Sequence, residues 1–301
     1  MKPAPTVILF TTLSGLGFGF LALLGLGLIA AQGWPAFFHW AFGYGLAVGG
    51  LLSSTFHLGH PERAWRAFSQ WRSSWLSREG VAAVATLLIL APQALSDWLG
   101  LGWGQGFGIL GAVGCAATVL CTAMIYAQLK TVPRWHHWTV PATYLAFALT
   151  GGLILAGTGL WATVAALGLG LLLAYGWRVG DSAFARAGVD LASATGLSGL
   201  GLPQVFEQPH TGSNYLMREM IFTVGRRHAA KLRTLALILA VGLPALAAAT
   251  LPVLPALILG GLSHLAGAMA QRWLFFAEAE HVVGLYYGRT SGKSSQRQGR
   301  P

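Results

Sequence analysis

The chain has 301 residues, of which 54% are hydrophobic and only 9% are charged, whereas about 25% of the residues in an average soluble domain are charged. So few polar side chains cannot cover the surface of a soluble protein, so the composition excludes a soluble globular fold. The formal net charge of +10 would suggest a nucleic-acid partner in a soluble protein, but here the positions of the basic residues explain it, and we expect no nucleic-acid binding.

Apolar segments of about 20 residues can cross the hydrocarbon core of a bilayer as helices. We therefore predict an all-α integral membrane protein with about eight transmembrane helices. Residues 1–288 would form the membrane domain, with a cytoplasmic insertion at 178–232, and residues 289–301 a basic disordered tail. In chain order, the predicted spans are 6–31, 35–57, 80–97, 104–129, 139–157, 159–177, 233–251 and 254–271.

All 19 lysine and arginine residues fall on one side of this arrangement. The connections near 32–34, 98–103, 157–159 and 251–254 contain none of them. Basic residues in short loops stay in the cytoplasm. We therefore expect an even number of spans in the bacterial inner membrane, with both termini cytoplasmic. The long connections then all lie on the cytoplasmic side, where we expect the functional site.

The connection after the second span carries the strongest candidate site. His57 lies where hydrocarbon gives way to headgroups, and Glu79 lies at the same depth where the third span begins. A quinone site needs an apolar slot, groups that hydrogen-bond the carbonyls of the head, and a proton donor or acceptor that water can reach. A histidine meets the last two needs near neutral pH. The alternative is that His57 caps a helix and that Glu79 pairs with one of Arg63, Arg66 and Arg78.

The connection after the fourth span begins near Tyr126, and Pro133 breaks its helix. Trp135 and Trp138 are typical interfacial anchors. Tyr126 can hydrogen-bond a quinone oxygen, but an interfacial tyrosine needs no such role.

Metal cofactors are not expected in this chain. An iron–sulfur cluster needs about four thiolates, and the chain has only Cys115 and Cys121, both in one apolar run. Haem b with two axial histidines requires them at one depth on facing helices. The membrane candidates, His39, His57 and His264, lie at different depths.

Two cytoplasmic segments suit contact with a partner. Apolar residues in 213–228 recur at helical spacing and predict an amphipathic helix, and residues 271–287 extend the last span past the membrane. The residues that we expect to dock a partner are charged or ionisable and cytoplasmic: Arg66, Arg72, Arg78, Arg134, Arg218, Glu219, Arg226, Arg227, Glu278, Glu280 and His281.

Several of these segments resemble a known family. Residues 57–64, 77–79 and 131–135, together with Tyr126, resemble the membrane anchors of the dimethyl sulfoxide reductase family in order and spacing. Residues 214–220 and 272–281 look more like the sulfite-oxidising branch, in which a cytoplasmic molybdenum enzyme oxidises sulfite to sulfate.

The resemblance implies a haem-free subunit that binds ubiquinone or menaquinone. It also implies two cytoplasmic partners, a four-cluster iron–sulfur subunit and a molybdopterin catalytic subunit. His57 and Glu79 match the family positions for quinol binding and protonation, and Arg63 and Tyr126 are further candidates. Electrons would run from the clusters of the partner to quinone near His57.

Three other interpretations stay open. Electrons can flow in reverse, from quinol to dimethyl sulfoxide or a related compound. The chain can be a secondary transporter, although its ionisable residues lie at the inner edge rather than at the midplane. It can also be a purely structural anchor without a quinone site.

Overall fold

The computed structural model describes residues 4–57, 60–201, 203 and 228–287, apart from the side chains of residues 57 and 61. This described part is helical and contains no β-strand. The tail at 289–301 and nearly all of the predicted amphipathic helix at 213–228 lie outside the described residues.

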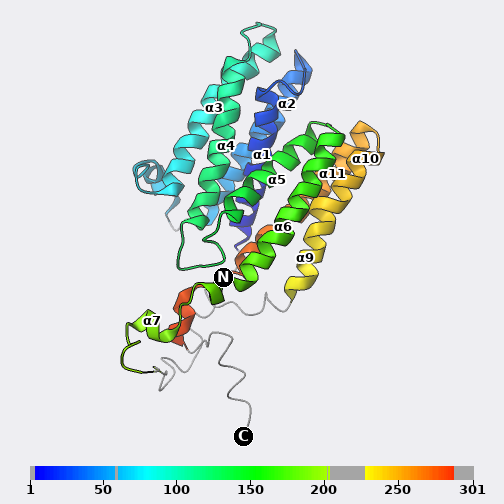
Figure 1. The fold of residues 1–301 in the computed structure, drawn as a ribbon. Coiled ribbons are helices and arrows are strands. Elements are labelled where there is room, and N and C mark those ends of the chain that lie inside the picture. Colours follow the sequence, from blue (N-terminus) through cyan, green and yellow to red (C-terminus); the bar gives the residue numbers. More distant parts are fainter. Residues whose placement is uncertain (1–3, 58–59, 202, 204–227, 288–301) are drawn as a thin grey trace.

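Eight apolar helical segments run up and down the molecule (Figure 1). Seven of the described segments are long and apolar enough to cross a membrane, and α5 is a shorter apolar helix of 17 residues, close to the minimum for a span. The predicted all-α membrane fold with about eight helices is therefore confirmed. The segments are α1 (Pro5–Gly25), α2 (Trp34–Ser53), α3 (Trp75–Leu99), α4 (Gly106–Ala127), α5 (Thr139–Leu155), α6 (Leu160–Arg186), α9 (Ala229–Leu237) with η4 (Ile238–Gly242) and α10 (Leu243–Thr250), and α11 (Val253–Ala277).

The ends of some helices differ from the prediction for local reasons. α1 ends at Gly25, before Gly27 takes a left-handed backbone conformation with φ +71°. α3 begins at Trp75, before the predicted 80, because the Ser74 side chain accepts a hydrogen bond from the Ser77 amide and caps the helix. α6 continues past 177 to Arg186.

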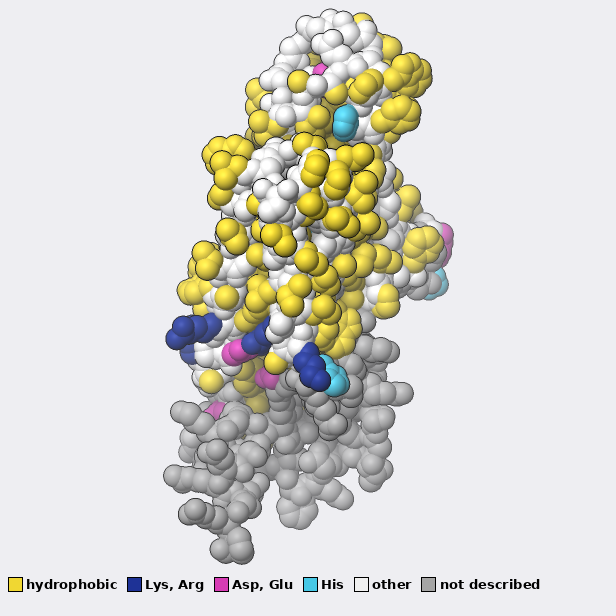
Figure 2. Space-filling model, turned by 90° about the vertical axis from the view of Figure 1, so that its right-hand side faces the viewer, with side chains coloured by type: hydrophobic (Ala, Val, Ile, Leu, Met, Phe, Trp, Pro, Cys, Tyr) yellow, Lys and Arg dark blue, Asp and Glu magenta, His cyan; other side chains and the backbone are white. Residues whose placement is uncertain are grey.

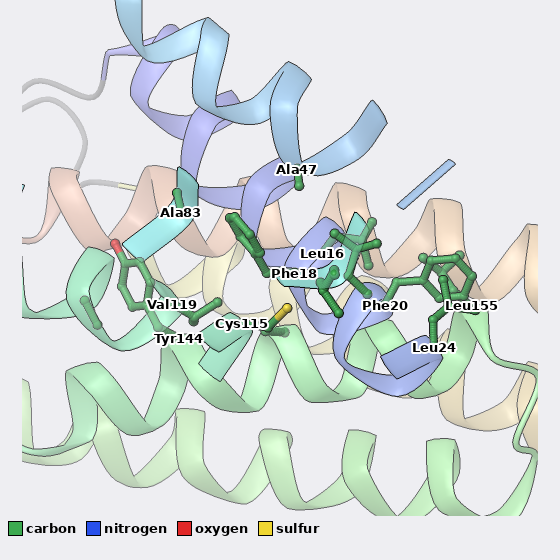
Figure 3. Close-up of a cluster of buried hydrophobic side chains, with 14 of the residues drawn as sticks. Leu16, Phe18, Phe20, Leu24, Ala47, Ala83, Cys115, Val119, Tyr144 and Leu155 are labelled. Atoms are coloured by element: carbon green, nitrogen blue, oxygen red, sulfur yellow. The ribbon is translucent and has the colours of Figure 1, made fainter. Parts of the chain in front are cut away.

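Helix α1 lies at the centre of the bundle and contacts α2, α4, α5 and α11. Over its most apolar 18-residue stretch α1 is 72% buried, whereas the corresponding stretches of the other long apolar helices are at most 44% buried, which leaves their remaining surface for lipid. Figure 3 shows Leu16, Phe18 and Phe20 of α1 among side chains from the neighbouring helices.

Small residues allow α1 and α2 to approach closely. A Cβ atom added to Gly50 would overlap the Ser14 amide nitrogen, and one added to Gly17 would overlap that of Ala47. Such contacts bring backbones together where lipid supplies no hydrophobic force between helices. The α1–α2 contact therefore depends on the absence of side chains at these positions.

Charged groups gather at one end of the bundle, here called the polar end, which comprises the α2–α3, α4–α5 and α6–α9 connections and η5 (Val282–Tyr287). Figure 2 shows basic and acidic side chains there, below a largely apolar surface. The opposite end has short connections and carries Asp97, whose carboxylate accepts hydrogen bonds from Trp40 and Gln93 at 3.0 and 2.8 Å.

Four charged side chains tie the polar ends of separate elements together. Arg233 of α9 lies 2.6 Å from carboxylate oxygens of both Asp181 (α6) and Glu278, the residue after α11. Arg134, in the α4–α5 connection, lies 2.5 Å from Asp181 and 3.4 Å from Glu278. This group is here called the ion-pair network, and Glu278, whose side chain is only 5% exposed, is its buried member.

Substitution of Gly50 by alanine should weaken the α1–α2 contact, by about 1–3 kcal/mol of overpacking. Gly49→Ala is the matched control, because nothing lies within 4 Å of a Cβ atom at that position. Thermal unfolding of the purified protein in detergent should show a lower midpoint for Gly50→Ala only. Equal midpoints for the two variants would contradict the close packing.

Among single charge removals in the ion-pair network, removal at the buried Glu278 should lower the free energy of unfolding most. Glu278→Gln leaves two arginines partly buried with one carboxylate and should lower stability by about 3 kcal/mol. Asp181→Asn should cost about 1 kcal/mol, because water reaches that half-exposed side chain. The same thermal unfolding measurement compares the two losses of stability, and a larger loss for Asp181→Asn than for Glu278→Gln would refute the prediction.

Candidate functional site

Glu79 lies in the second turn of α3, at the polar end, and its side chain faces α4. It is only 3% exposed. The Thr122 hydroxyl of α4 is hydrogen-bonded to Glu79 Oε1. A carboxyl group inside a membrane bundle is costly unless its environment satisfies it, and such groups commonly carry function.

Thr122 can serve both protonation states of Glu79. Its Oγ1 lies 3.1 Å from the Thr118 carbonyl oxygen as well as beside Glu79 Oε1, yet a hydroxyl has only one proton to donate. When Glu79 is ionised, Thr122 can donate to the carboxylate. When Glu79 is protonated, its own O–H can donate to Thr122 Oγ1, and Thr122 then donates to Thr118. The pair is therefore suited to gaining and losing a proton.

His57 ends the short helix η1 (Ser54–His57), which follows α2 directly. η1 packs against α1 and α2, and α2 packs against α3. η1 and α3 both contact η2, so His57 and Glu79 lie on elements of the polar end that η2 connects. The side chain of His57 lies outside the described part, so its approach to Glu79 remains a prediction.

The three arginines considered as partners of Glu79 are bound elsewhere. Arg63 lies 3.7 Å from Glu62 on the exposed helix η2 (Pro61–Phe68). Arg66 lies over the ring of Trp65. Arg78 donates to the carbonyl oxygens of Trp71 and Arg72 at 3.0 and 2.6 Å. The alternative in which Glu79 pairs with one of these arginines is therefore not found among the described residues, and Arg63 is not brought to Glu79.

η2 nevertheless lies beside the start of α3. A Cβ atom at Gly80 would lie 3.2 Å from the Phe68 ring, so η2 covers the part of α3 that carries Glu79. Around it, Phe56, Trp65 and Trp71 have exposed rings. These apolar surfaces at the polar end offer contacts for a lipid-soluble molecule.

Tyr126 lies one turn after Thr122 on α4, on the same face. Its ring packs against those of Trp135 and Phe275, both with centroids 5.3 Å away, and against Tyr144 at 6.0 Å. The structure therefore brings Tyr126 to the Glu79 side of the bundle, inside an aromatic cluster.

Arg272 is a buried residue that was predicted to lie past the membrane, in the extension 271–287 of the last span. Arg272 lies inside α11, and only 3% of it is exposed. Its guanidinium lies 3.3 Å from the ring centroid of Tyr144 and 5.5 Å from that of Phe147. Apolar residues continue after it through 273–277, and this pattern could have placed it within the helix rather than behind it.

The predicted docking residues divide into four groups. Arg66 and Arg72 are exposed. Glu280 and His281 are partly buried, and His281 Nδ1 accepts a hydrogen bond from the Val283 amide. Three residues are bound within the chain: Arg78, Arg134 and Glu278. Four lie outside the described residues: Arg218, Glu219, Arg226 and Arg227. Glu278 does not present its carboxylate on the surface as expected, because Arg134 and Arg233 bind it inside the chain.

No group of three or more His, Cys, Asp and Glu side chains that could hold a metal ion occurs among the described residues. Cys115 and Cys121 are free thiols. His264 is buried, and its ring nitrogens lie 3.0 and 3.2 Å from the carbonyl oxygens of Ala240 and Phe147.

Comparison with known proteins places the chain in a family. The family model "DMSO reductase anchor subunit (DmsC)" matches residues 6–288. The chain is also 31% identical, over 95% of its length and 99% of the relative, to the C subunit of the sulfite dehydrogenase of Allochromatium vinosum. Both the extent of the family match and the full coverage of this relative lead to one conclusion. This multi-pass membrane protein belongs to the DMSO reductase anchor subunit family.

Proposed function

We propose that the chain is the quinone-reactive membrane anchor of a three-subunit molybdopterin and iron–sulfur oxidoreductase. In this proposal, electrons released by sulfite oxidation reach quinone at this chain through a four-cluster iron–sulfur subunit. The observation that carries the proposal is the buried Glu79 beside Thr122, at the end of the bundle where η1 ends at His57. A purely structural anchor has no need of a buried carboxyl group in this position.

The chemistry assigns distinct tasks to the residues. Reduction of a quinone consumes two electrons and two protons. Glu79 gives a proton to one quinone oxygen, and His57 hydrogen-bonds the head and exchanges protons near neutral pH. Tyr126 and Arg63 are proposed as further polar contacts of the head. The exposed rings around η2 receive the apolar part of the quinone.

The substrate of the catalytic partner is proposed as sulfite, because the relative named above belongs to a sulfite dehydrogenase and aligns over nearly its whole length. The second candidate is a DMSO reductase-type enzyme in which quinol is oxidised at the same site, and the family description favours it. Assays of the purified complex separate them: quinone reduction with sulfite supports the first, and quinol oxidation with dimethyl sulfoxide supports the second.

The polar end is proposed to face the cytoplasm of a bacterial inner membrane, because the basic residues of the described connections lie there. The partners would dock on this end. Among the described residues, Arg66 and Arg72 are suited to contact them because they are exposed, and Glu280 and His281 lie nearby in the segment before η5. Arg218, Glu219, Arg226 and Arg227 remain proposed contacts from the sequence.

Glu79→Gln and His57→Ala should each lower electron transfer between the partner subunits and quinone, by up to about 100-fold, the effect of a lost proton donor or acceptor. His60→Ala is the matched control for His57, because the His60 side chain is exposed and pairs with Glu62 rather than with a residue of the proposed site. Turnover is measured with a soluble quinone on complexes shown to contain all subunits. Normal turnover in both site variants would remove the quinone assignment.

Orientation is tested with reporters fused to the C-terminus. A fluorescent protein that matures only in the cytoplasm should be bright, and alkaline phosphatase, which needs the periplasm, should be inactive. The same two reporters inserted at Gly102, in the α3–α4 connection, provide the control for the opposite end, because that connection is exposed and carries no lysine or arginine. There the phosphatase should be active and the fluorescent protein dark. An active phosphatase at the C-terminus would overturn the proposed orientation.

A further inference from the structure

A quinone site that uses a buried carboxyl group needs a route by which protons reach that group. The structure holds three cavities that follow one another from the polar end toward Glu79. Each shares two lining residues with the next.

The outermost cavity has a volume of about 250 Å³ and is lined by the ion-pair network, including the half-exposed Asp181. The middle cavity, of about 50 Å³, shares Arg134 and Glu278 with it. The innermost cavity, of about 20 Å³, shares Tyr144 and Arg272 with the middle one. It is also lined by Thr122, the hydrogen-bond partner of Glu79.

The middle cavity is lined by residues with buried polar atoms that lack a hydrogen-bond partner in the protein, so it is suited to hold water. Five buried side-chain atoms of the described residues have no hydrogen-bond partner within the protein, and three of them, Tyr144 Oη, Gln271 Oε1 and Trp177 Nε1, belong to residues that line this cavity. Tyr144 is 2% exposed and Gln271 is 6% exposed. Buried polar groups nearly always find a partner, often an ordered water. A volume of this size holds roughly three waters, and the innermost cavity holds about one.

We propose that these linked cavities hold a chain of water molecules that carries protons between the polar end and Glu79. The role of the water chain in supplying protons rests on the proposed quinone chemistry, whereas the cavities and the unpartnered polar atoms are independent of it. The last step passes through the Thr122 hydroxyl, which can donate to Glu79 or to Thr118.

Each proton step balances. The Glu79 carboxyl gives its proton to a quinone oxygen as an electron arrives from the iron–sulfur partner. The carboxylate that remains takes a proton from the water chain, and bulk water at Asp181 refills the other end. Reduction of one quinone takes up two protons, one delivered by Glu79 through this path and one exchanged at His57.

The first test is structural and does not depend on quinone. An experimental structure of the assembled complex, at a resolution that resolves waters, should show ordered waters bonded to Tyr144 Oη, Gln271 Oε1 and Trp177 Nε1. A dry middle cavity would overturn the proposal.

The second test is kinetic and uses the whole complex. Gln271→Leu should lower the turnover of quinone several-fold without a change in the KM for quinone, and a small weak acid such as azide or formate should restore part of the loss. Gln93→Leu is the matched control: it is also a buried glutamine with an unpartnered side-chain oxygen, but it lies near Asp97 at the opposite end. Equal turnover in the two variants, or a change confined to KM, would overturn the water path.

A second pair of variants covers the case in which Gln271→Leu fails to assemble. Tyr144→Phe removes only the hydroxyl and keeps the ring under Arg272, so the same loss and rescue are expected. Tyr44→Phe is its control, because the Tyr44 hydroxyl donates to the Leu87 carbonyl oxygen away from the cavities. The two proposals fail differently. Normal turnover in both Glu79→Gln and His57→Ala removes the quinone site, whereas lower turnover in Glu79→Gln with normal turnover in both path variants removes only the water path.

Discussion

The hydrocarbon of a bilayer offers no hydrogen bonds, so every polar side chain between the helices must be satisfied by the protein or by water enclosed in it. This constraint governs the arrangement of the whole bundle. Asp97 is held by Trp40 and Gln93 at one end, and Glu79 by Thr122 toward the other. The exposed arginines of the described residues lie at the polar end, where water is available.

Close helix packing gives these polar contacts a fixed geometry. α1 approaches α2 through residues without bulky side chains, and it also contacts α4 and α5, the helices of Thr122 and Tyr144. The ion-pair network fixes the polar ends of α6, α9 and α11 relative to the α4–α5 connection. The same contacts set the positions of the side chains that line the small cavities between these helices.

Membership of the anchor family and the buried carboxyl group fit one mechanism. In the proposed mechanism, a quinone receives electrons from docked partners and protons through the cavities beside Tyr144 and Arg272, with Glu79 as the proton donor. The apolar tail of the quinone would then enter near the exposed rings of η2, whereas protons would enter between α5, α6 and α11.

The sequence by itself determined the number, order and alternation of the helices, because about 20 consecutive apolar residues have no other stable state in a membrane. It also located Glu79, which stands at the start of a span within a family motif. Only the tertiary structure decided what Glu79 contacts, since Thr122 lies 43 residues away on another helix. It likewise decided that Arg272 and Glu278 point inward and that Arg63 does not reach Glu79. The physical reason is that residues facing lipid and residues facing other helices are equally apolar, so hydropathy does not specify which faces of the helices meet.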